Sequence, residues 1–139
     1  MKLRRLTRRV ARYYEAEVGK TGLKNTQYSL LSHVDKLGPL RPSDLARAMT
    51  VEASTLTRNL KPLIASGWLA LDPGVDGRSR MVSLTAAGRE KRQEAQRKWR
   101  IAQESINTAL GARRVIALHA LLDECMELLA PAKEEDNDE

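Results

Sequence analysis

Apolar residues recur every three or four positions along most of the chain, a spacing typical of amphipathic α-helices. Two shorter segments, residues 68–72 and 80–84, place apolar or β-branched residues at alternate positions and predict strands. The sequence PGVDGRS between them is rich in turn formers, so one β-hairpin is expected. Helices are expected at residues 2–18, from 25 or 26 to 37 with Asn25 or Thr26 as the cap, at 42–49, at about 52–66, at 86–110 and, after a break at residue 111, over 115–129. The pattern therefore predicts a mainly α protein with a small β-hairpin.

The helices at 42–49 and 52–66 are joined by a tight turn over residues 50–52, which is the arrangement of a helix-turn-helix. One face of the second helix is apolar and is expected to be buried; it carries Ala53, Leu56, Leu60, Leu63 and Ile64. Pro62 lies inside this helix and cannot donate to the Arg58 carbonyl group, so a kink is expected near Arg58.

The opposite face of the same helix has no acidic residue. It carries Ser54, Thr55, Arg58 and Lys61, with Thr57 and Asn59 at its edges. Hydroxyl groups bind phosphates, and a guanidinium can bind O6 and N7 of one guanine, so this face predicts contact with double-stranded DNA. The alternative is an ordinary solvated face, but such faces usually mix Glu with Lys.

The distribution of charge agrees with a polyanionic partner. The net charge is +6, but the last nine residues hold five acids and one lysine, so the first 130 residues carry +10. Such a basic domain favours nucleic acid over a merely solvated basic surface. Residues 131–139 are too charged and too poor in apolar side chains to pack, and they are expected to be disordered.

The residue types that carry catalysis and metal binding are sparse. The two histidines, His33 and His119, and the single cysteine, Cys125, give no metal-ligand spacing. No nucleophile with a base and no glycine-rich phosphate loop is found, so neither an enzyme nor a cofactor is expected. One cysteine excludes an intramolecular disulfide and fits a cytoplasmic location. No apolar run reaches the roughly 18–20 residues of a membrane span.

The segment LRPSDLARAMTVEASTLTRNLKPLIASGWLALDPGVDGRSRMVSLTAAGRE closely resembles the MarR (multiple antibiotic resistance regulator) family. The family's pattern of D-x-R, then a strand, then L-T-x-x-G stands here at residues 76–78 and 84–88. STLTRNL and SGWL also match, and GLKNTQYSLLSHV looks like the family's second helix, with Lys24 in place of its usual Thr. The resemblance covers roughly residues 2–130.

This resemblance implies a winged helix-turn-helix lobe over residues 23–85 and a helical dimerisation domain made of residues 1–22 and 86–130. Two apolar faces fit a homodimer, because the small lobe cannot cover them. One carries Leu3, Leu6, Val10, Tyr13 and Tyr14, with Glu17 as an exception, and the other is a seam of Val115, Leu118, Leu122, Cys125 and Leu129. Membrane binding by the first face is not expected, because it has no Trp or Phe. On the seam, Cys125 is expected to be a buried structural residue rather than a redox switch.

The hairpin is the wing of such a fold. Arg78 and Arg80 at its tip are expected to enter a narrow minor groove, where the negative potential is enhanced. Asp76 is expected to hold the Arg78 side chain by a charge-assisted hydrogen bond. The alternative is an ordinary Asp-Gly turn with a solvated arginine.

The resemblance also implies a small aromatic or phenolic effector, bound between the dimer helices and the DNA lobe. The amphipathic side chains that could face it are Tyr13, Tyr14, Tyr28, His33 and Trp99, and each of them could instead belong to the core or the surface. The function expected is a ligand-responsive repressor that binds a pseudo-palindromic operator as a homodimer. The alternative is a winged-helix protein-interaction module, which should carry acidic or apolar residues on the exposed helix face and no arginines at the wing.

Overall fold

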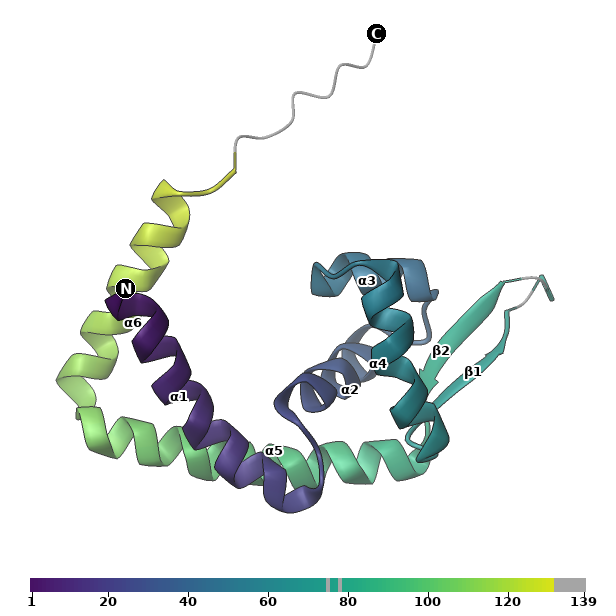
Figure 1. Cartoon of the computed structure of the whole chain (residues 1–139), viewed down its shortest axis with the longest axis horizontal. Coiled ribbons are helices and arrows are strands. Elements are labelled where there is room, and N and C mark those ends of the chain that lie inside the picture. The colour runs from purple at the N-terminus through teal and green to yellow at the C-terminus, as the bar shows by residue number, and fades with distance from the viewer. Residues whose placement is uncertain (75, 78, 132–139) are drawn as a thin grey trace, which may run out of the picture. The chain divides into compact units, whose positions relative to one another are not determined.

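The computed structural model describes residues 1–74, 76–77 and 79–131. Its elements are α1 (Lys2–Val18), the short 3-10 helix η1 (Gly19–Thr21), α2 (Asn25–Leu37), α3 (Pro42–Met49), α4 (Ala53–Ala65), β1 (Leu69–Pro73), β2 (Arg80–Leu84), α5 (Ala86–Leu110) and α6 (Ala112–Leu128) (Figure 1). The prediction of a mainly helical fold with one hairpin is confirmed.

The chain divides into two compact units, residues 1–103 and the residues from 104 onward. The predicted division into a DNA-binding lobe and a dimerisation domain stays a prediction, and its boundaries differ from those of the two units.

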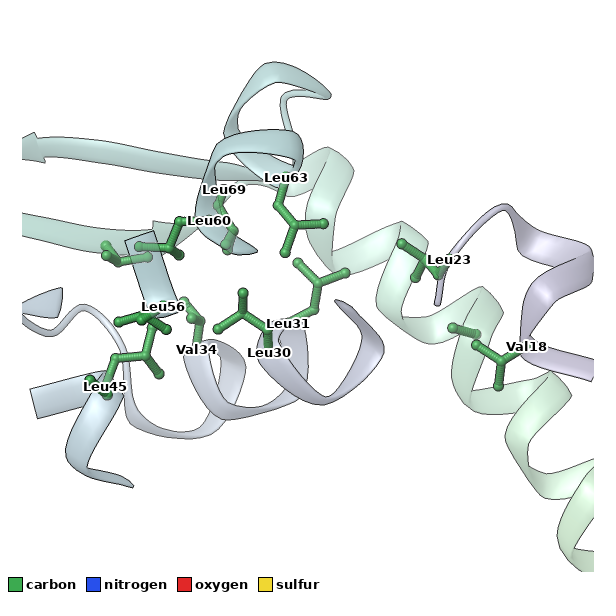
Figure 2. Close-up of a cluster of buried hydrophobic side chains, with 13 residues drawn as sticks. Val18, Leu23, Leu30, Leu31, Val34, Leu45, Leu56, Leu60, Leu63 and Leu69 are labelled. Atoms are coloured by element: carbon green, nitrogen blue, oxygen red, sulfur yellow. The ribbon is translucent and has the colours of Figure 1, made fainter. Parts of the chain in front are cut away.

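The core of the first unit is a cluster of aliphatic side chains, most of them from α2, α3, α4 and the hairpin, with Leu23, Val18 of α1 and Ala95 of α5 (Figure 2). Leu56, Leu60 and Leu63 of α4 are all nearly inaccessible to solvent. Burial of a leucine side chain contributes about 1.5–3 kcal/mol, so these three side chains fix how α4 is rotated about its axis. The predicted burial of Ala53 is wrong, because this residue lies in the first turn of α4 and is exposed. α4 runs through Pro62 to Ala65, and the kink expected near Arg58 stays a prediction.

The turn between α3 and α4 has the conformation that a helix-turn-helix requires. Thr50 ends α3 with φ 55° and ψ 46°, a left-handed conformation that is uncommon for a residue with a branched side chain. The Val51 amide donates to the Ala46 carbonyl oxygen at 3.0 Å and closes the end of α3. The chain then enters α4 through Glu52, which is extended.

The hairpin is an antiparallel pair in which Leu69 lies opposite Leu84 and Pro73 lies opposite Arg80. A third segment, which the sequence did not predict, pairs with the other edge of β2. The Leu40 and Val82 backbones exchange two hydrogen bonds, of 3.1 Å and 2.8 Å. β2 is therefore bonded on both sides, and the hairpin is attached to the segment that leads into α3.

The start of α5 is fixed against the segment that follows α4. The Thr85 hydroxyl group accepts a hydrogen bond from the Gly88 amide at 2.9 Å and donates one to the Gly67 carbonyl oxygen at 2.6 Å. The Thr85 amide donates to the Trp68 carbonyl oxygen at 3.2 Å. Gly88 is buried, and a Cβ atom there would lie only 2.8 Å from the Trp68 carbonyl carbon. The L-T-x-x-G pattern thus has a physical reason: the threonine caps α5, and the glycine lets the Trp68 backbone come close.

The link between α1 and α2 is closed by local hydrogen bonds. Thr21 is buried and donates its hydroxyl proton to the Val18 carbonyl oxygen at 2.6 Å. α2 begins at Asn25, but the prediction that Asn25 or Thr26 caps it is wrong. Lys24 occupies the N-cap position, and its amide donates to Oε1 of Gln27 at 2.9 Å. The Gln27 side chain therefore binds the amide of the N-cap residue and closes the first turn of α2.

In the second unit, α6 has no buried residue in the single chain. Leu122 of the predicted seam is 38% exposed and Leu129 is 82% exposed. Cys125 is also exposed, so its predicted burial is wrong for the isolated chain, because no side chain among the described residues covers this face of α6. The predicted disordered tail, apart from Pro131, lies outside the described residues.

The close approach at Gly88 gives a first prediction. Gly88→Ala is expected to lower the free energy of unfolding by about 1–3 kcal/mol, because the new methyl group forces apart the Trp68 backbone and α5. Urea denaturation at fixed protein concentration measures this. Gly19→Ala is the matched control, since Gly19 has a helical φ of −59° and no atom lies within 4 Å of the added Cβ. If the two variants were equally stable, the close approach would not matter for folding.

Candidate nucleic-acid interface

The structure leaves most of the predicted recognition face of α4 open to solvent. Ser54, Thr57, Arg58, Asn59 and Lys61 are exposed. Thr55, which was predicted on the same exposed face, is half-buried. The face is therefore carried by five residues that span two turns of the helix.

Arg58 and Lys61 are the cations of this face. Neither has a hydrogen bond or an ion pair with any residue in the described part of the chain. They are three residues apart, so their side chains project from neighbouring positions on one helix face. Both groups keep their full hydrogen-bonding capacity for a phosphate or a base edge.

The hydroxyl groups of this face differ in what they can offer. Thr57 already donates its hydroxyl proton to the Ala53 carbonyl oxygen at 2.9 Å. Its oxygen can still accept a hydrogen bond, but its proton is not available to a phosphate, which only accepts. Ser54 lies in the first turn of α4, where no side chain caps the amide groups of the helix N-terminus. The exposed Ser54 hydroxyl and these amides are therefore the donors that suit a phosphate.

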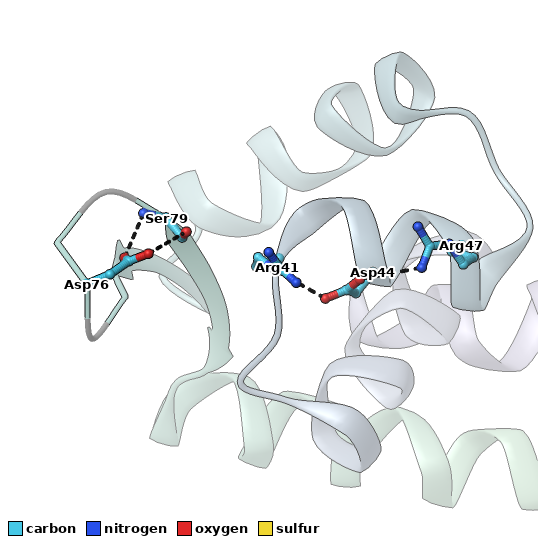
Figure 3. Close-up of polar contacts among 5 residues, drawn as sticks. All are labelled: Arg41, Asp44, Arg47, Asp76 and Ser79. Atoms are coloured by element: carbon cyan, nitrogen blue, oxygen red, sulfur yellow. Dashed lines mark hydrogen bonds and ion pairs between the residues drawn. The ribbon is translucent and has the colours of Figure 1, made fainter.

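α3 adds cations that sequence analysis did not single out. Asp44 lies between two arginines: its Oδ2 is 3.3 Å from Nε of Arg41, and its Oδ1 is 3.8 Å from Nη1 of Arg47 (Figure 3). Both arginine side chains are largely exposed, so these ion pairs are weak. The spacing of three residues on each side of Asp44 was the signal in the sequence that could have identified them.

The wing loop is organised by Asp76. Its Oδ1 accepts a hydrogen bond from the Ser79 amide at 3.0 Å, and its Oδ2 accepts one from the Ser79 hydroxyl group at 3.1 Å (Figure 3). Gly77, with φ 72°, donates its amide proton to the Gly74 carbonyl oxygen at 2.9 Å. Arg80 is exposed at the first position of β2. Arg78 lies outside the described residues, so the predicted bond between Asp76 and Arg78 stays a prediction.

The structure brings four of the five predicted effector residues into one pocket of about 450 Å³ in the first unit. The pocket is lined by Tyr14, Tyr28, His33 and Trp99, together with Asn25, Ser29, Ser32, Arg92 and Gln96. Tyr13 does not line it and is 45% exposed. The Tyr14 ring stacks on Trp99 with 5.5 Å between the ring centroids.

Polar groups in this pocket are held in defined orientations. The Tyr14 hydroxyl group donates to Oε1 of Gln103, and burial raises the pKa of this phenol, so it is a neutral donor at pH 7. Nδ1 of His33 lies 2.7 Å from the Ser29 carbonyl oxygen, which can only accept. Nδ1 of His33 therefore carries a proton.

Arg92 connects the pocket to a network between α2 and α5. Its Nη1 is 3.3 Å from Oδ2 of Asp35, and its Nε donates to the Ser32 hydroxyl oxygen at 3.2 Å. Arg89 reaches the other oxygen of Asp35 at 4.0 Å but does not line the pocket. A group in the pocket that attracts Arg92 would compete directly with Asp35.

Two other classes of site have no support in the described part of the chain. No group of His, Cys, Asp and Glu side chains that could hold a metal ion is found among residues 1–74, 76–77 and 79–131. Within the same residues, no helix has the length and apolar character needed to cross a bilayer.

Comparisons with known proteins agree with this geometry. A model described as "MarR family" matches residues 21–79. The uncharacterized HTH-type transcriptional regulator YwoH of Bacillus subtilis is 31% identical over 87 residues, which are 63% of this chain and 64% of that protein, a little under two thirds of its length. The M. tuberculosis transcriptional regulator MosR, solved in complex with DNA, is 32% identical with a TM-score of 0.69 over 94% of this chain and 96% of that one. A mutant MarR from E. coli, solved with operator DNA, has a TM-score of 0.80 at 20% identity over 89% of this chain and 90% of that one, which supports the fold alone.

Proposed function

The chain belongs to the MarR family of transcriptional regulators, and from this premise we propose that it is a cytoplasmic, ligand-responsive repressor that binds a pseudo-palindromic operator as a homodimer. The observation that carries the proposal is the exposed face of α4. This face has no acidic residue, and its cations Arg58 and Lys61 have no partner in the described part of the chain.

Each protomer places α4 in a major groove and its wing in the flanking minor groove. Arg58 is central on the exposed face and suits a base edge, whereas Lys61 is one turn further along and suits a phosphate. Arg78 and Arg80 supply the wing's positive charge. Asp76 is a positioning residue, because its carboxylate is occupied by two hydrogen bonds from Ser79 and would be repelled by phosphate.

The alternative, a protein-interaction module that does not touch DNA, has less support. Such a module should present acidic or apolar residues on the exposed face of α4, and this face presents neither. Dimerisation is supported by the apolar surface of α6, where Leu121, Leu122 and Leu129 are all exposed in the single chain. A large exposed apolar surface is typical of an interface between subunits.

The ligand response is assigned to the pocket between α2 and α5. Its stacked rings suit a flat aromatic ligand, and Arg92 suits a carboxylate on that ligand. A bound carboxylate draws Arg92 away from Asp35 and weakens the ion pair between α2 and α5. Because α2 packs on α3 in the helix-turn-helix, a shift of α2 reaches the DNA-binding helices.

The different roles proposed for Arg58, Lys61 and Arg78 in DNA binding are testable with three variants. Arg58→Ala is expected to flatten the base preference at one symmetric pair of operator positions and to cost about 1–3 kcal/mol. Lys61→Ala should weaken operator and random duplex equally and lower the salt slope by about 0.9. Arg78→Ala should weaken binding most where A·T-rich flanks narrow the minor groove. Binding titrations use operator, flank-scrambled operator and random duplex at two salt concentrations. If Arg78→Ala bound all three like the wild type, the wing would not lie in the groove.

The dimer is testable by sedimentation at micromolar concentration. The wild type is expected to have about twice the chain mass of 15.6 kDa, because association buries the apolar seam of α6. Leu118→Glu should produce monomers and abolish operator binding. Ala120→Glu adds the same charge on the opposite side of α6 and should leave the dimer intact. A wild-type monomer at this concentration would exclude the model with two half-sites.

The ligand pocket is testable with benzoate and its neutral analogue benzamide. Trp99 is one of two tryptophans, so in a Trp68→Phe background its fluorescence reports binding in the pocket. Arg92→Gln is expected to weaken benzoate binding about tenfold or more and benzamide binding much less, because a hydrogen bond to a charged group contributes about 1.5–3 kcal/mol. Arg89→Gln is the control, since Arg89 contacts Asp35 but does not line the pocket. Equal losses for the two ligands would exclude a carboxylate at Arg92.

A further inference from the structure

α1 carries a dense cationic surface that the function proposed above does not use. Five arginines lie on one side of this helix, and we call them the arginine face: Arg4, Arg5, Arg8, Arg9 and Arg12. All five side chains are exposed. None has a hydrogen bond or an ion pair with any residue in the part of the chain that the structure describes.

The arginine face works against the helix that carries it. Arg4 and Arg8, Arg5 and Arg9, and Arg8 and Arg12 are like-charge pairs four residues apart, and such pairs destabilise a helix. The first turn of α1 has no acidic residue and no side-chain cap, so Arg4 and Arg5, which lie in that turn, also face the positive end of the helix dipole. Local arrangements that oppose the fold are expected mainly where function requires them. A bound anion would remove both penalties.

The shape of the surface selects the kind of anion. Arg4, Arg8 and Arg12 follow one another along the axis at a rise of about 6 Å for every four residues. This line of guanidinium groups, each of which can bind a phosphate through two hydrogen bonds, suits a linear polyanion better than a single small ion. The phosphate backbone of nucleic acid is such a polyanion.

A membrane surface fits the same helix poorly. A helix that lies on a bilayer buries its apolar face, with its cations beside that face so that they reach the headgroups. In α1 the arginine face lies nearly opposite the apolar side. Tyr14 of the apolar side already stacks on Trp99, and Val18 at the end of the helix is buried. A bilayer on the apolar side would leave the arginines pointing toward water.

We propose that the arginine face of α1 is a second binding surface for the phosphate backbone of DNA, separate from α4 and the wing. The choice of DNA rests on the proposed function, whereas the charge arrangement does not. Binding at this surface is independent of base sequence, because only phosphates are contacted. A protein with both surfaces can hold a second DNA segment beside its operator.

The test compares the salt dependence of binding to a short random-sequence duplex. A variant with Arg4→Gln, Arg8→Gln and Arg12→Gln removes three charges from the arginine face. The matched control removes three exposed charges elsewhere, through Arg97→Gln, Arg100→Gln and Arg113→Gln. Each lost phosphate contact lowers the slope of log K against log salt by about 0.9, so the first variant should lose between about 2 and 3 units and the control less than about 1.

A second measurement separates a binding role from a structural one. Without DNA and at low salt, the triple glutamine variant of α1 should have a higher Tm than the wild type, because like-charge repulsion in α1 is relieved. The control variant should change Tm less. A triple variant that melts at a lower temperature than the wild type would overturn the argument that the arginines oppose the fold.

The outcomes for the two proposals can be told apart. Equal salt slopes for the triple variant and its control would overturn the second surface and leave the role of α4 intact. If the double variant Arg58→Ala, Lys61→Ala bound DNA like the wild type while the triple variant lost binding, the proposed role of α4 would fail and the second surface would stand.

An immobilised duplex should also capture a second, labelled duplex through the wild type but not through the triple variant. Capture by both proteins would place the second duplex elsewhere.

Discussion

The architecture depends on one close contact, between the backbone of Trp68 and the first turn of α5. Gly88 has no side chain to keep the Trp68 carbonyl group away, and the Thr85 amide donates to that carbonyl oxygen. The Thr85 hydroxyl group binds the Gly67 carbonyl oxygen and the Gly88 amide at the same point. Three elements therefore share one junction: the end of α4, the first pair of the hairpin and the start of α5. α4 cannot change its direction without disturbing the other two.

In the first unit, the positions of the acidic side chains determine which arginines and lysines form ion pairs and which stay unpaired. Asp44 holds Arg41 and Arg47, and Asp35 holds Arg89 and Arg92. These carboxylates offset the arginines of α3 and α5, but neither of them reaches α4 or α1. The leucines of α4 fix the rotation of that helix, so Arg58 and Lys61 cannot turn toward an acid. The exposed faces of α4 and α1 are thus two places in the first unit where unpaired cations gather, while others, such as Arg97 and Arg100, lie on α5.

The sequence was sufficient to place the helices and the hairpin along the chain. Spacing of apolar residues predicted the elements, and the cap by Thr85 follows from residue type alone. It was insufficient where two distant segments meet. The pairing of Leu40 with Val82 depends on tertiary packing, although Leu40 lies between Pro39 and Pro42, which favour an extended chain.

The residues of the candidate site show the same difference between features that one helix determines and features that depend on tertiary packing. The exposed face of α4 was predictable from the periodicity of one helix. By contrast, the pocket joins side chains of α1, α2 and α5, and only tertiary structure shows that Tyr13 lies outside it and Arg92 inside. Arg92 was not a candidate at all, because its role depends on Asp35 and Ser32, which lie about 60 residues earlier in the chain. Ala53 was misplaced for a related reason: a helical projection ignores that a first turn has no preceding turn to cover it.

Unpaired charge on two faces makes salt act on this protein in two directions. Added salt screens the repulsion among the α1 arginines, so it stabilises the fold of the unbound chain. The same salt weakens phosphate binding, because each counterion that is released from the DNA gains less entropy when the bulk salt concentration is higher. DNA binding stabilises only the folded state, so the stabilisation it provides decreases with salt while the stability of the free protein rises. A protein whose surface cations were all paired would show neither trend strongly, since ion pairs already within the fold release few counterions on binding. The opposed trends are therefore a physical signature of cations that the fold holds without an internal partner.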